Sequence, residues 1–298
     1  MTKKPSFRKL LNERESILLP GAFNALVAKL IEAKGFEAVY CTGAGISTSL
    51  LGLPDIGLIS LSEMTQMVGY ICSAVKLPVI SDADTGFGNA INVMRTVWEF
   101  EKVGAAGIHI EDQVSPKRCG HVAGKEILPV EEMVGKIRAA VKARTNPDFM
   151  IIARTDARSI EGITRAIERA KRYRDAGADI IFPEALETES EFSEVAKAVP
   201  GIPLMANMTE FGKTPYLSVQ EFSQMGYKVV VFPVSTMRIA MKAVEEFLTE
   251  LKSKGTQRDF LGRMQTRKEL YDLINYPQFT TWETEYLPRR GIDPLAKH

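Results

Sequence analysis

The sequence predicts a (β/α)8 barrel of the TIM type, an α/β fold built on eight parallel strands. Eight short apolar runs recur along the 298 residues, each is followed by an amphipathic segment, and glycine-containing turns close several of these segments. The apolar runs are continuous rather than alternating, which is typical of parallel strands buried on both faces. A doubly wound sheet is the alternative, because periodicity does not show whether a sheet closes.

The eight units follow one another without a break. Strands are predicted at residues 17–20, 37–42, 78–82, 106–111, 149–154, 179–183, 202–206 and 228–233. Helices are predicted at residues 23–34, 61–75, 93–103, 130–143, 160–176, 189–199, 218–225 and 236–251. Turns such as Gly104-Ala105-Ala106 precede strands, and glycine is favoured just past the end of a helix.

Residues 1–298 are predicted to form a single domain, because no Pro- or Ser-rich linker divides the chain. Residues from about 255 to 298 then form a C-terminal extension of the barrel. Residues 263–273 have helical spacing, and the tail with Trp282 and Tyr286 is predicted to be less regular. Exposed aromatic side chains are costly, so this extension is expected to pack against another subunit.

Composition excludes several classes of protein. The chain is 45% hydrophobic and 25% charged, which is typical of globular proteins, and its net charge of +1 favours neither nucleic acid nor an anionic membrane as a partner. No apolar run approaches the roughly 20 residues that span a bilayer. Cys41, Cys72 and Cys119 are odd in number and lack CxxC spacing, which argues against disulfides and structural zinc. A reducing cytoplasm fits best.

A loop rich in reactive side chains follows the fourth predicted strand. Residues 115–121 read Ser-Pro-Lys-Arg-Cys-Gly-His, so Cys119 stands beside Lys117 and Arg118 and close to His121. Neighbouring cations lower the pKa of a thiol, which makes Cys119 and His121 candidate catalytic groups. A surface loop with an inert cysteine is the alternative.

The ends of the predicted strands carry matching polar groups, and barrel enzymes place reactive residues there. Asp82, Asp84 and Glu111 form an oxygen-rich set suited to Mg²⁺, although helix capping by one aspartate is the alternative. Arg154 and Arg238 are suited to bidentate contacts with substrate carboxylates. A structural pair of Arg154 with Glu184 is also compatible with the sequence.

Further features narrow the substrate. The turn at residues 43–45 and the side chains of Asn207 and Thr209 can donate hydrogen bonds to a carboxylate. Gly-rich phosphate loops after strands seven and eight are missing from the sequence, which disfavours a phosphorylated substrate. The residues therefore predict a Mg²⁺-dependent enzyme that cleaves a C–C bond in a small polycarboxylate, with Cys119 as acid or base.

The loop and the strand before it resemble a known family. Lys117-Arg118-Cys119-Gly120-His121, preceded by His-Ile-Glu-Asp-Gln at 109–113, resembles the signature of the isocitrate lyase and phosphoenolpyruvate mutase superfamily. Other stretches resemble its short bacterial branch, the 2-methylisocitrate lyases, at residues 82–88, 153–157, 182–185, 206–212 and 264–267. The resemblance runs from about residue 6 to about residue 280. It implies cleavage of 2-methylisocitrate, a tricarboxylate, to pyruvate and succinate in propionate breakdown by the methylcitrate cycle.

The resemblance also implies roles for individual residues. Mg²⁺, or alternatively Mn²⁺, is expected on Asp82 and Asp84, and Cys119 is expected to protonate the succinate carbanion. Tyr40 is a candidate base for the substrate hydroxyl. Asp55, His109 and Glu111 are expected beside the metal ligands. Residues expected to contact substrate are Thr42, Gly43, Ala44, Cys119, Gly120, Arg154, Glu184, Asn207, Thr209, Arg238 and Arg267. The family also implies a homotetramer with exchanged C-terminal helices.

The sequence departs from the family motif at one turn, and several alternative functions stay open. Thr42-Gly43-Ala44 stands where many relatives have Ser-Gly-Gly, which alters the pocket beside the substrate methyl group. Isocitrate lyases share the cysteine motif but usually carry large insertions that this chain lacks. Oxaloacetate hydrolases and related lyases retain the motif and stay open as alternatives. A non-catalytic carboxylate-binding protein is the alternative from another class, and the presence of Cys119 and both aspartates argues against it.

Overall fold

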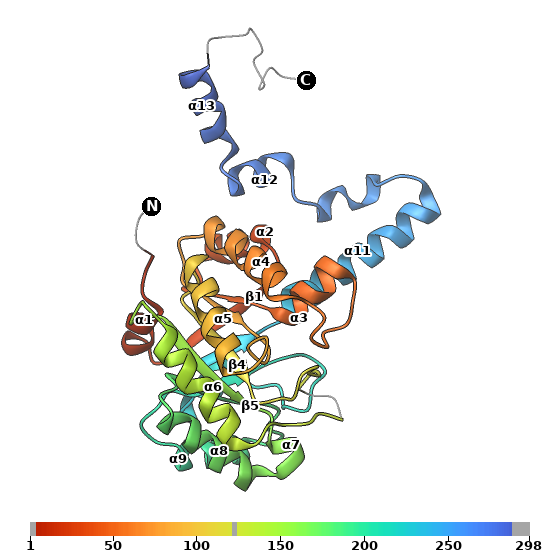
Figure 1. Ribbon diagram of the computed structural model, residues 1–298. Helices are drawn as coiled ribbons and strands as arrows, with labels where there is room; N and C mark the ends of the chain where they lie inside the picture. The colour runs from red at the N-terminus through yellow and green to blue at the C-terminus, as the bar shows by residue number, and fades with distance from the viewer. Residues whose placement is uncertain (1–3, 121–123, 288–298) are drawn as a thin grey trace. The chain divides into compact units, whose positions relative to one another are not determined.

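The structure is a computed structural model that describes residues 4–120 and 124–287 (Figure 1). It divides into two compact units, Met1–Ile239 and Ala240–His298, which are described separately. The prediction of one domain with an extension from about residue 255 stays a prediction.

Eight parallel strands form the centre of the first unit. They are β1 (Ile17–Ala22), β2 (Val39–Cys41), β3 (Val79–Asp82), β4 (Gly107–Glu111), β5 (Met150–Thr155), β6 (Ile180–Pro183), β7 (Met205–Asn207) and β8 (Val229–Phe232). Their order is β6-β5-β4-β3-β2-β1-β8-β7, and an isolated parallel bridge from Ile181 to Leu204 links the two ends. This nearly closed ring confirms the predicted barrel, and the doubly wound alternative is wrong because β1 pairs with β8.

Helices surround the strands and follow them in sequence (Figure 1). The helices that the sequence predicted are α2 (Ala25–Ala33), α4 (Leu61–Ala74), α5 (Ala90–Lys102), α6 (Val130–Ala143), α8 (Ile163–Asp175), α9 (Glu189–Ala198), α10 (Val219–Gln224) and α11 (Ser235–Lys254). The sequence analysis missed four short elements, which are α1 (Phe7–Glu13), α3 (Gly43–Ile46), the π-helical turn Ser47–Leu51 and α7 (Arg158–Glu161).

Local sequence signals explain several helix boundaries. Ser60 and Glu63 form a capping box at the start of α4, and Ser218 and Glu221 form another at α10. Gly104 follows α5 with a φ of 89°, a backbone conformation that glycine adopts without strain. The glycine turns noted in the sequence therefore do end helices before strands.

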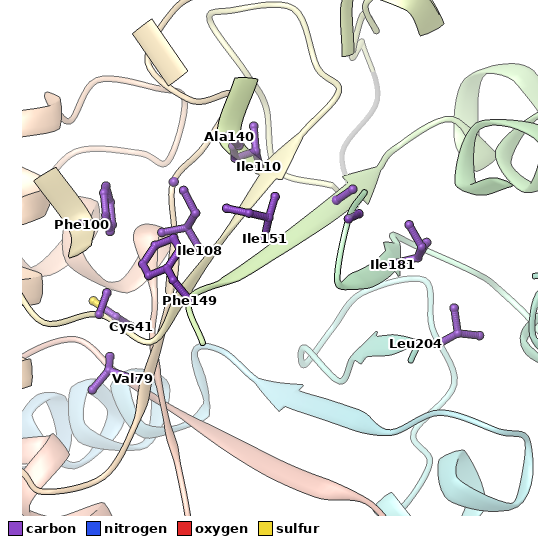
Figure 2. Packing of buried hydrophobic residues seen from close by; sticks show 14 of the residues in the cluster. Cys41, Val79, Phe100, Ile108, Ile110, Ala140, Phe149, Ile151, Ile181 and Leu204 are labelled. Atoms are coloured by element: carbon purple, nitrogen blue, oxygen red, sulfur yellow. The ribbon is translucent and has the colours of Figure 1, made fainter. Parts of the chain in front are cut away.

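The strands are buried on both faces, which explains their continuous apolar runs. Ile80 and Ile152 point into the barrel, where Phe7 and Leu11 of α1 join the same cluster. Their neighbours on the strands belong to a second cluster between the sheet and the helices. Figure 2 shows part of it, with Cys41, Val79, Phe100, Ile108, Ala140, Phe149 and Ile151 among the labelled side chains.

The second unit contains part of α11, a 3-10 helix at Arg258–Arg263, α12 (Arg267–Leu273) and α13 (Tyr276–Tyr286). A helix was predicted near residues 263–273, where α12 lies. The prediction of a less regular tail is wrong, because α13 is a helix and Pro277 in its first turn starts it. Trp282 and Tyr286 are exposed. Exchange of this unit between subunits stays a prediction. Within the described residues, no helix combines the length and the apolarity that a membrane crossing requires.

Phe7 offers a test of the packing inside the barrel. Phe7 is fully buried, whereas Phe211 is 83% exposed. We expect Phe7→Ala to lower the free energy of unfolding by about 3–5 kcal/mol, because it leaves a cavity in a packed core. The matched change Phe211→Ala is expected to change it by less than about 0.5 kcal/mol. Urea unfolding followed by circular dichroism measures both, and equal effects would contradict the placement of α1.

Candidate active site

The carboxyl ends of the strands enclose a cavity at one rim of the barrel. Most of the predicted site residues line it, although they are far apart in the sequence. They are Tyr40, Thr42, Ala44, Asp55, Asp82, Cys119, Gly120, Arg154, Glu184, Asn207, Thr209 and Arg238. Lys117, Arg118 and Phe182 complete its polar and aromatic lining. The barrel thus brings most of the site residues predicted from the sequence together at one cavity.

Two aspartates lie at the end of β3. Asp84 adopts a left-handed backbone conformation with a φ of 47°, and its N–H donates to Asp82 Oδ1 at 2.9 Å. Gly43 is pressed against the same group, since a Cβ there would lie 2.5 Å from Asp82 Oδ2. Burial raises the pKa of both carboxyls, that of Asp84 to about 6, and the positive charge of Lys117 opposes the rise.

Lys117 reaches from the loop into this acidic group. Its ammonium lies 2.5 Å from Asp55 Oδ1 and 3.0 Å from Asp84 Oδ1. Burial lowers the pKa of Lys117, but the carboxylates of Asp84 and Asp55 raise it well above its usual value. The sequence analysis assigned this charge to the thiol, whereas the structure pairs it with aspartates. Only the fold shows that pairing, because Asp55 lies in a distant loop.

The carboxylates of Asp82 and Asp84 are the candidate Mg²⁺ ligands at this rim. Within the described ranges, no group of three or more His, Cys, Asp or Glu side chains has metal-binding geometry. Mg²⁺ does not require one, since it usually takes one or two carboxylates and completes its shell with waters and substrate. Among the described residues, Asp84 Oδ1 and Glu111 Oε2 are held by ion pairs with Lys117 and Arg154, and Glu111 Oε1 accepts no hydrogen bond. Asp82 and Asp84 therefore fit Mg²⁺ as its protein ligands.

His109 connects Tyr40 with the acidic group. Its Nε2 lies 2.7 Å from the Tyr40 hydroxyl and 3.4 Å from Asp82 Oδ1. Burial lowers the pKa of His109 to about 3, so the imidazole is neutral, and burial also raises the pKa of Tyr40 well above its usual value. Tyr40 is thus a protonated phenol in this environment, and its assignment as a base stays a prediction.

Arg154, at the end of β5, is held by three acidic residues. Its Nε and Nη2 donate to Asp156 at 2.9 and 3.1 Å. Its Nη1 lies 3.2 Å from Glu111 Oε2 and 3.5 Å from Glu184 Oε2. The sequence offered Arg154 as a ligand for a substrate carboxylate or as a structural partner of Glu184. The structure is compatible with both, because Arg154 lines the cavity and also forms structural pairs. Asp156 lies at the end of the predicted fifth strand, two residues after Arg154, but the sequence analysis assigned it no role of its own.

The loop that carries Cys119 is anchored at its base. Gln113 Nε2 donates to the Arg118 carbonyl, and the Arg118 N–H donates back to Gln113 Oε1, both at 2.9 Å. Gln113 also forms an antiparallel bridge with Ile127. Cys119 is exposed, whereas Gly120 is buried against Arg154 and Glu184. His121 lies outside the described residues, so its assignment stays a prediction.

Other predicted residues have distinct surroundings. Glu184 accepts a hydrogen bond from Asn207 Nδ2 at 3.2 Å. Arg238 is half-exposed at the cavity, 3.4 Å from Glu210 Oε2. Arg267 begins α12 in the second unit, so its contact with substrate stays a prediction.

Comparison with known proteins places the chain in a family. The family model for phosphoenolpyruvate phosphomutase matches residues 7–252. The chain belongs to this family. It is 53% identical to a 2-methylisocitrate lyase of Aeropyrum pernix, over 98% of this chain and 93% of the relative. It is 47% identical to a 2,3-dimethylmalate lyase of Eubacterium barkeri, over 97% and 100%. The predicted resemblance to 2-methylisocitrate lyases is confirmed.

Solved structures agree with this placement. A crystal structure of 2,3-dimethylmalate lyase has a TM-score of 0.90 at 35% identity and covers 97% of each chain. A phosphonopyruvate hydrolase in complex with oxalate and Mg²⁺ has a TM-score of 0.87 at 32% identity, over 97% of this chain and 100% of that one.

The three cysteines offer a test of the site's exposure. Cys119 is exposed, whereas Cys41 and Cys72 are buried. Burial raises the pKa of the Cys72 thiol to about 11 and that of Cys41 still further, so neither forms thiolate near neutral pH. We expect iodoacetamide at pH 8 to alkylate Cys119 alone in the native protein and all three in urea. Peptide mass spectrometry reads the sites, and native labelling of Cys41 or Cys72 would contradict the structure.

Proposed function

We propose that the protein is a carbon–carbon lyase that cleaves 2-methylisocitrate to pyruvate and succinate. The observation that carries the proposal is the meeting of Asp82, Arg154 and Cys119 at one cavity, with Asp84 hydrogen-bonded to Asp82 beside it. The identity to proteins named 2-methylisocitrate lyase over almost the whole chain supports the same substrate. We place the enzyme in the cytoplasm, as a homotetramer that exchanges its C-terminal helices.

Asp82 and Asp84 would hold Mg²⁺, which supplies positive charge beside the substrate carboxylate and hydroxyl. Lys117 adds a fixed cation on the same side, because Asp55 and Asp84 keep it protonated. Arg154 and Arg238 add two guanidiniums that line the cavity. A substrate with three carboxylates would find these guanidiniums and the bound metal as its cationic partners.

The reaction requires one base and one acid. As a base takes the hydroxyl proton, the C–O bond becomes the carbonyl of pyruvate, and the electron pair of the breaking C–C bond moves to the succinate carbon. Cys119 then gives its thiol proton to that carbon and is left as a thiolate. Tyr40 and Glu111 are the candidate bases, and because burial raises the pKa of both, either would act only with the positive charge of a bound Mg²⁺ beside it.

Substrate choice is the first test of this function. We expect the purified protein with Mg²⁺ to release pyruvate from 2-methylisocitrate at least tenfold faster, in kcat/KM, than it releases glyoxylate from isocitrate. Oxaloacetate and 2,3-dimethylmalate complete the panel, because relatives act on such compounds by name. A chelator should abolish turnover and added Mg²⁺ should restore it. A preference for another substrate, or no turnover of any, would overturn the assignment.

Cys119→Ser tests the acid. A hydroxyl is a much weaker acid than a thiol, so we expect kcat to fall by about 10²–10⁴-fold, within the range of general acid catalysis. The variant should still bind Mg²⁺ and pyruvate, which isothermal titration calorimetry measures. Cys72→Ala is the matched control and should keep its activity, because Cys72 is buried away from the cavity. Normal turnover by Cys119→Ser would show that the thiol is not the catalytic acid.

A further inference from the structure

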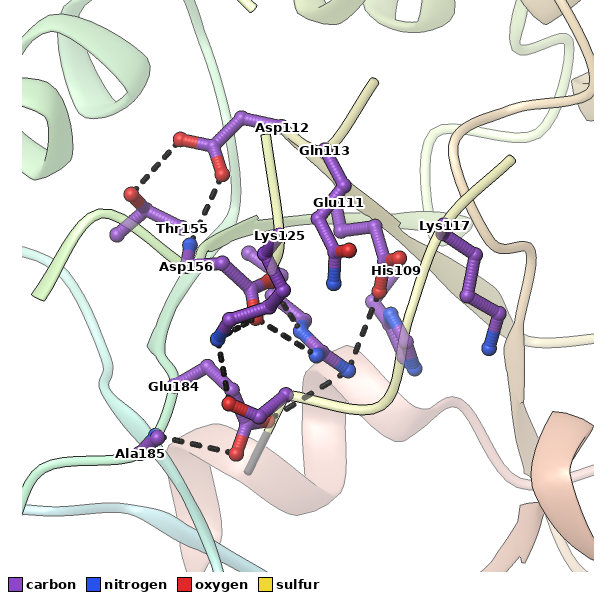
Figure 3. Close-up of polar contacts among 12 residues, drawn as sticks. His109, Glu111, Asp112, Gln113, Lys117, Lys125, Thr155, Asp156, Glu184 and Ala185 are labelled. Atoms are coloured by element: carbon purple, nitrogen blue, oxygen red, sulfur yellow. Dashed lines mark hydrogen bonds and ion pairs between the residues drawn. The ribbon is translucent and has the colours of Figure 1, made fainter. Parts of the chain in front are cut away.

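A second lysine of the loop makes a contact that the reaction described above does not use. The Lys125 side chain is almost fully buried, and its ammonium donates to the backbone carbonyl of Gly120 and to Asp156 Oδ1, the latter at 2.9 Å. Figure 3 shows Lys125 and Asp156 directed toward one another beside Glu184. The contact with Gly120 joins residues that the structure describes on the two sides of 121–123.

This ammonium is an unusual group to bury. A lysine loses its hydration when it enters the interior, and burial is tolerated only where anionic or carbonyl oxygens replace the water. Lys125 has a carboxylate and a carbonyl as such partners. Asp156 in turn holds Arg154 in a bidentate pair. Lys125 therefore touches the loop backbone next to Cys119 and the acidic residue that orients the cavity arginine.

Gly120 explains why this contact must be tight. A Cβ at Gly120 would lie 2.5 Å from Glu184 Cγ and 2.6 Å from Arg154 Nη2, so the loop backbone fits directly against both side chains. The carbonyl of Gly120 needs a donor in this enclosed place, and Lys125 supplies it. Cys119 is bonded to Gly120, so the position of that peptide sets the position of the thiol.

We propose that Lys125 is a positioning residue that fixes Cys119 at the cavity by tying the Gly120 carbonyl to Asp156. This role rests on the proposed function for its effect on catalysis, but the contact itself does not. Lys125 acts through the backbone and through Asp156. It neither donates the proton nor binds the metal. Loss of its ammonium frees the peptide after Cys119 and leaves the acidic residues around Arg154 with one cation fewer.

Lys125→Met is the direct test, because methionine has similar length but neither charge nor donor. We expect kcat for 2-methylisocitrate to fall by about 10²-fold, the size of effect that a displacement of about 1 Å can cause, while KM changes less than about threefold. Lys142→Met is the matched control, since Lys142 is an exposed lysine of α6. It should retain wild-type kinetics. Wild-type kcat in Lys125→Met would overturn the proposal.

A second readout follows the loop itself. Trypsin cleavage after Arg118, identified by mass spectrometry in the presence of Mg²⁺, pyruvate and succinate, should be at least tenfold faster in Lys125→Met than in the wild type or in Lys142→Met. Equal rates would overturn the contact. If wild-type protein cleaves no 2-methylisocitrate, the proposed function fails, whereas this cleavage still reports whether Lys125 holds the loop.

Two further experiments distinguish a positioning role of Lys125 from a role in folding. They are chemical rescue with an amine and chemical labelling of the wild-type protein. Propylamine should restore kcat of Lys125→Ala at least tenfold without affecting the wild type, because it returns an ammonium to the vacated space. Absence of rescue in a folded variant would contradict the proposal. If neither variant folds, reductive methylation of wild-type protein decides. Lys125 should react at least tenfold more slowly than Lys142, and equal rates would overturn the contact.

Discussion

The structure depends on the burial of the Arg154 guanidinium among acidic side chains. A buried cation of this kind is stable only when every partner stays in place, since removal of one leaves an uncompensated charge. Asp156 directly follows β5, which carries Arg154, whereas Glu111 ends the neighbouring strand β4 and Glu184 directly follows β6. The pairing of these three strands therefore assembles the electrostatic centre of the cavity.

A second buried ion group lies on the other side of the loop cysteine. Lys117 pairs with Asp55 and Asp84, and Lys125 pairs with Asp156. The two lysines flank Cys119 in the sequence and extend into different acidic groups. The loop is thus held by charge on both sides of the thiol, and loop position and site electrostatics depend on each other. Such buried ion pairs favour one geometry of the loop rather than adding much net stability.

The barrel supports this arrangement from behind. Asp112, at the end of β4, accepts hydrogen bonds from Thr155 and from the Asp156 N–H (Figure 3). It also accepts one from Tyr173 of α8. Its own carbonyl accepts the Leu128 N–H where the loop returns to α6. One buried aspartate therefore joins two strands, one helix and the end of the loop. The rim of the cavity is consequently rigid close to the groups that carry the proposed chemistry.

The sequence alone determined the barrel, most of its elements and most of the cavity residues. Continuous apolar runs carry the strand signal because both strand faces are buried, and polar residues at strand ends mark the rim. Short elements such as α1 and α3 were missed because one or two turns leave little periodicity. The helical tail was missed because α13 owes its start to Pro277 rather than to an apolar stripe.

The partner of each charge was decided only by the tertiary structure. Lys117 stands two residues from Cys119 in the sequence, yet its ammonium pairs with Asp55, 62 positions away. Lys125 and Asp156 showed no local pattern that linked them, because 31 positions separate them. Composition and spacing identify charged residues, but Coulomb energy depends on distance in space and on burial. Closure of the barrel sets both, and it thereby decides which cation serves which carboxylate.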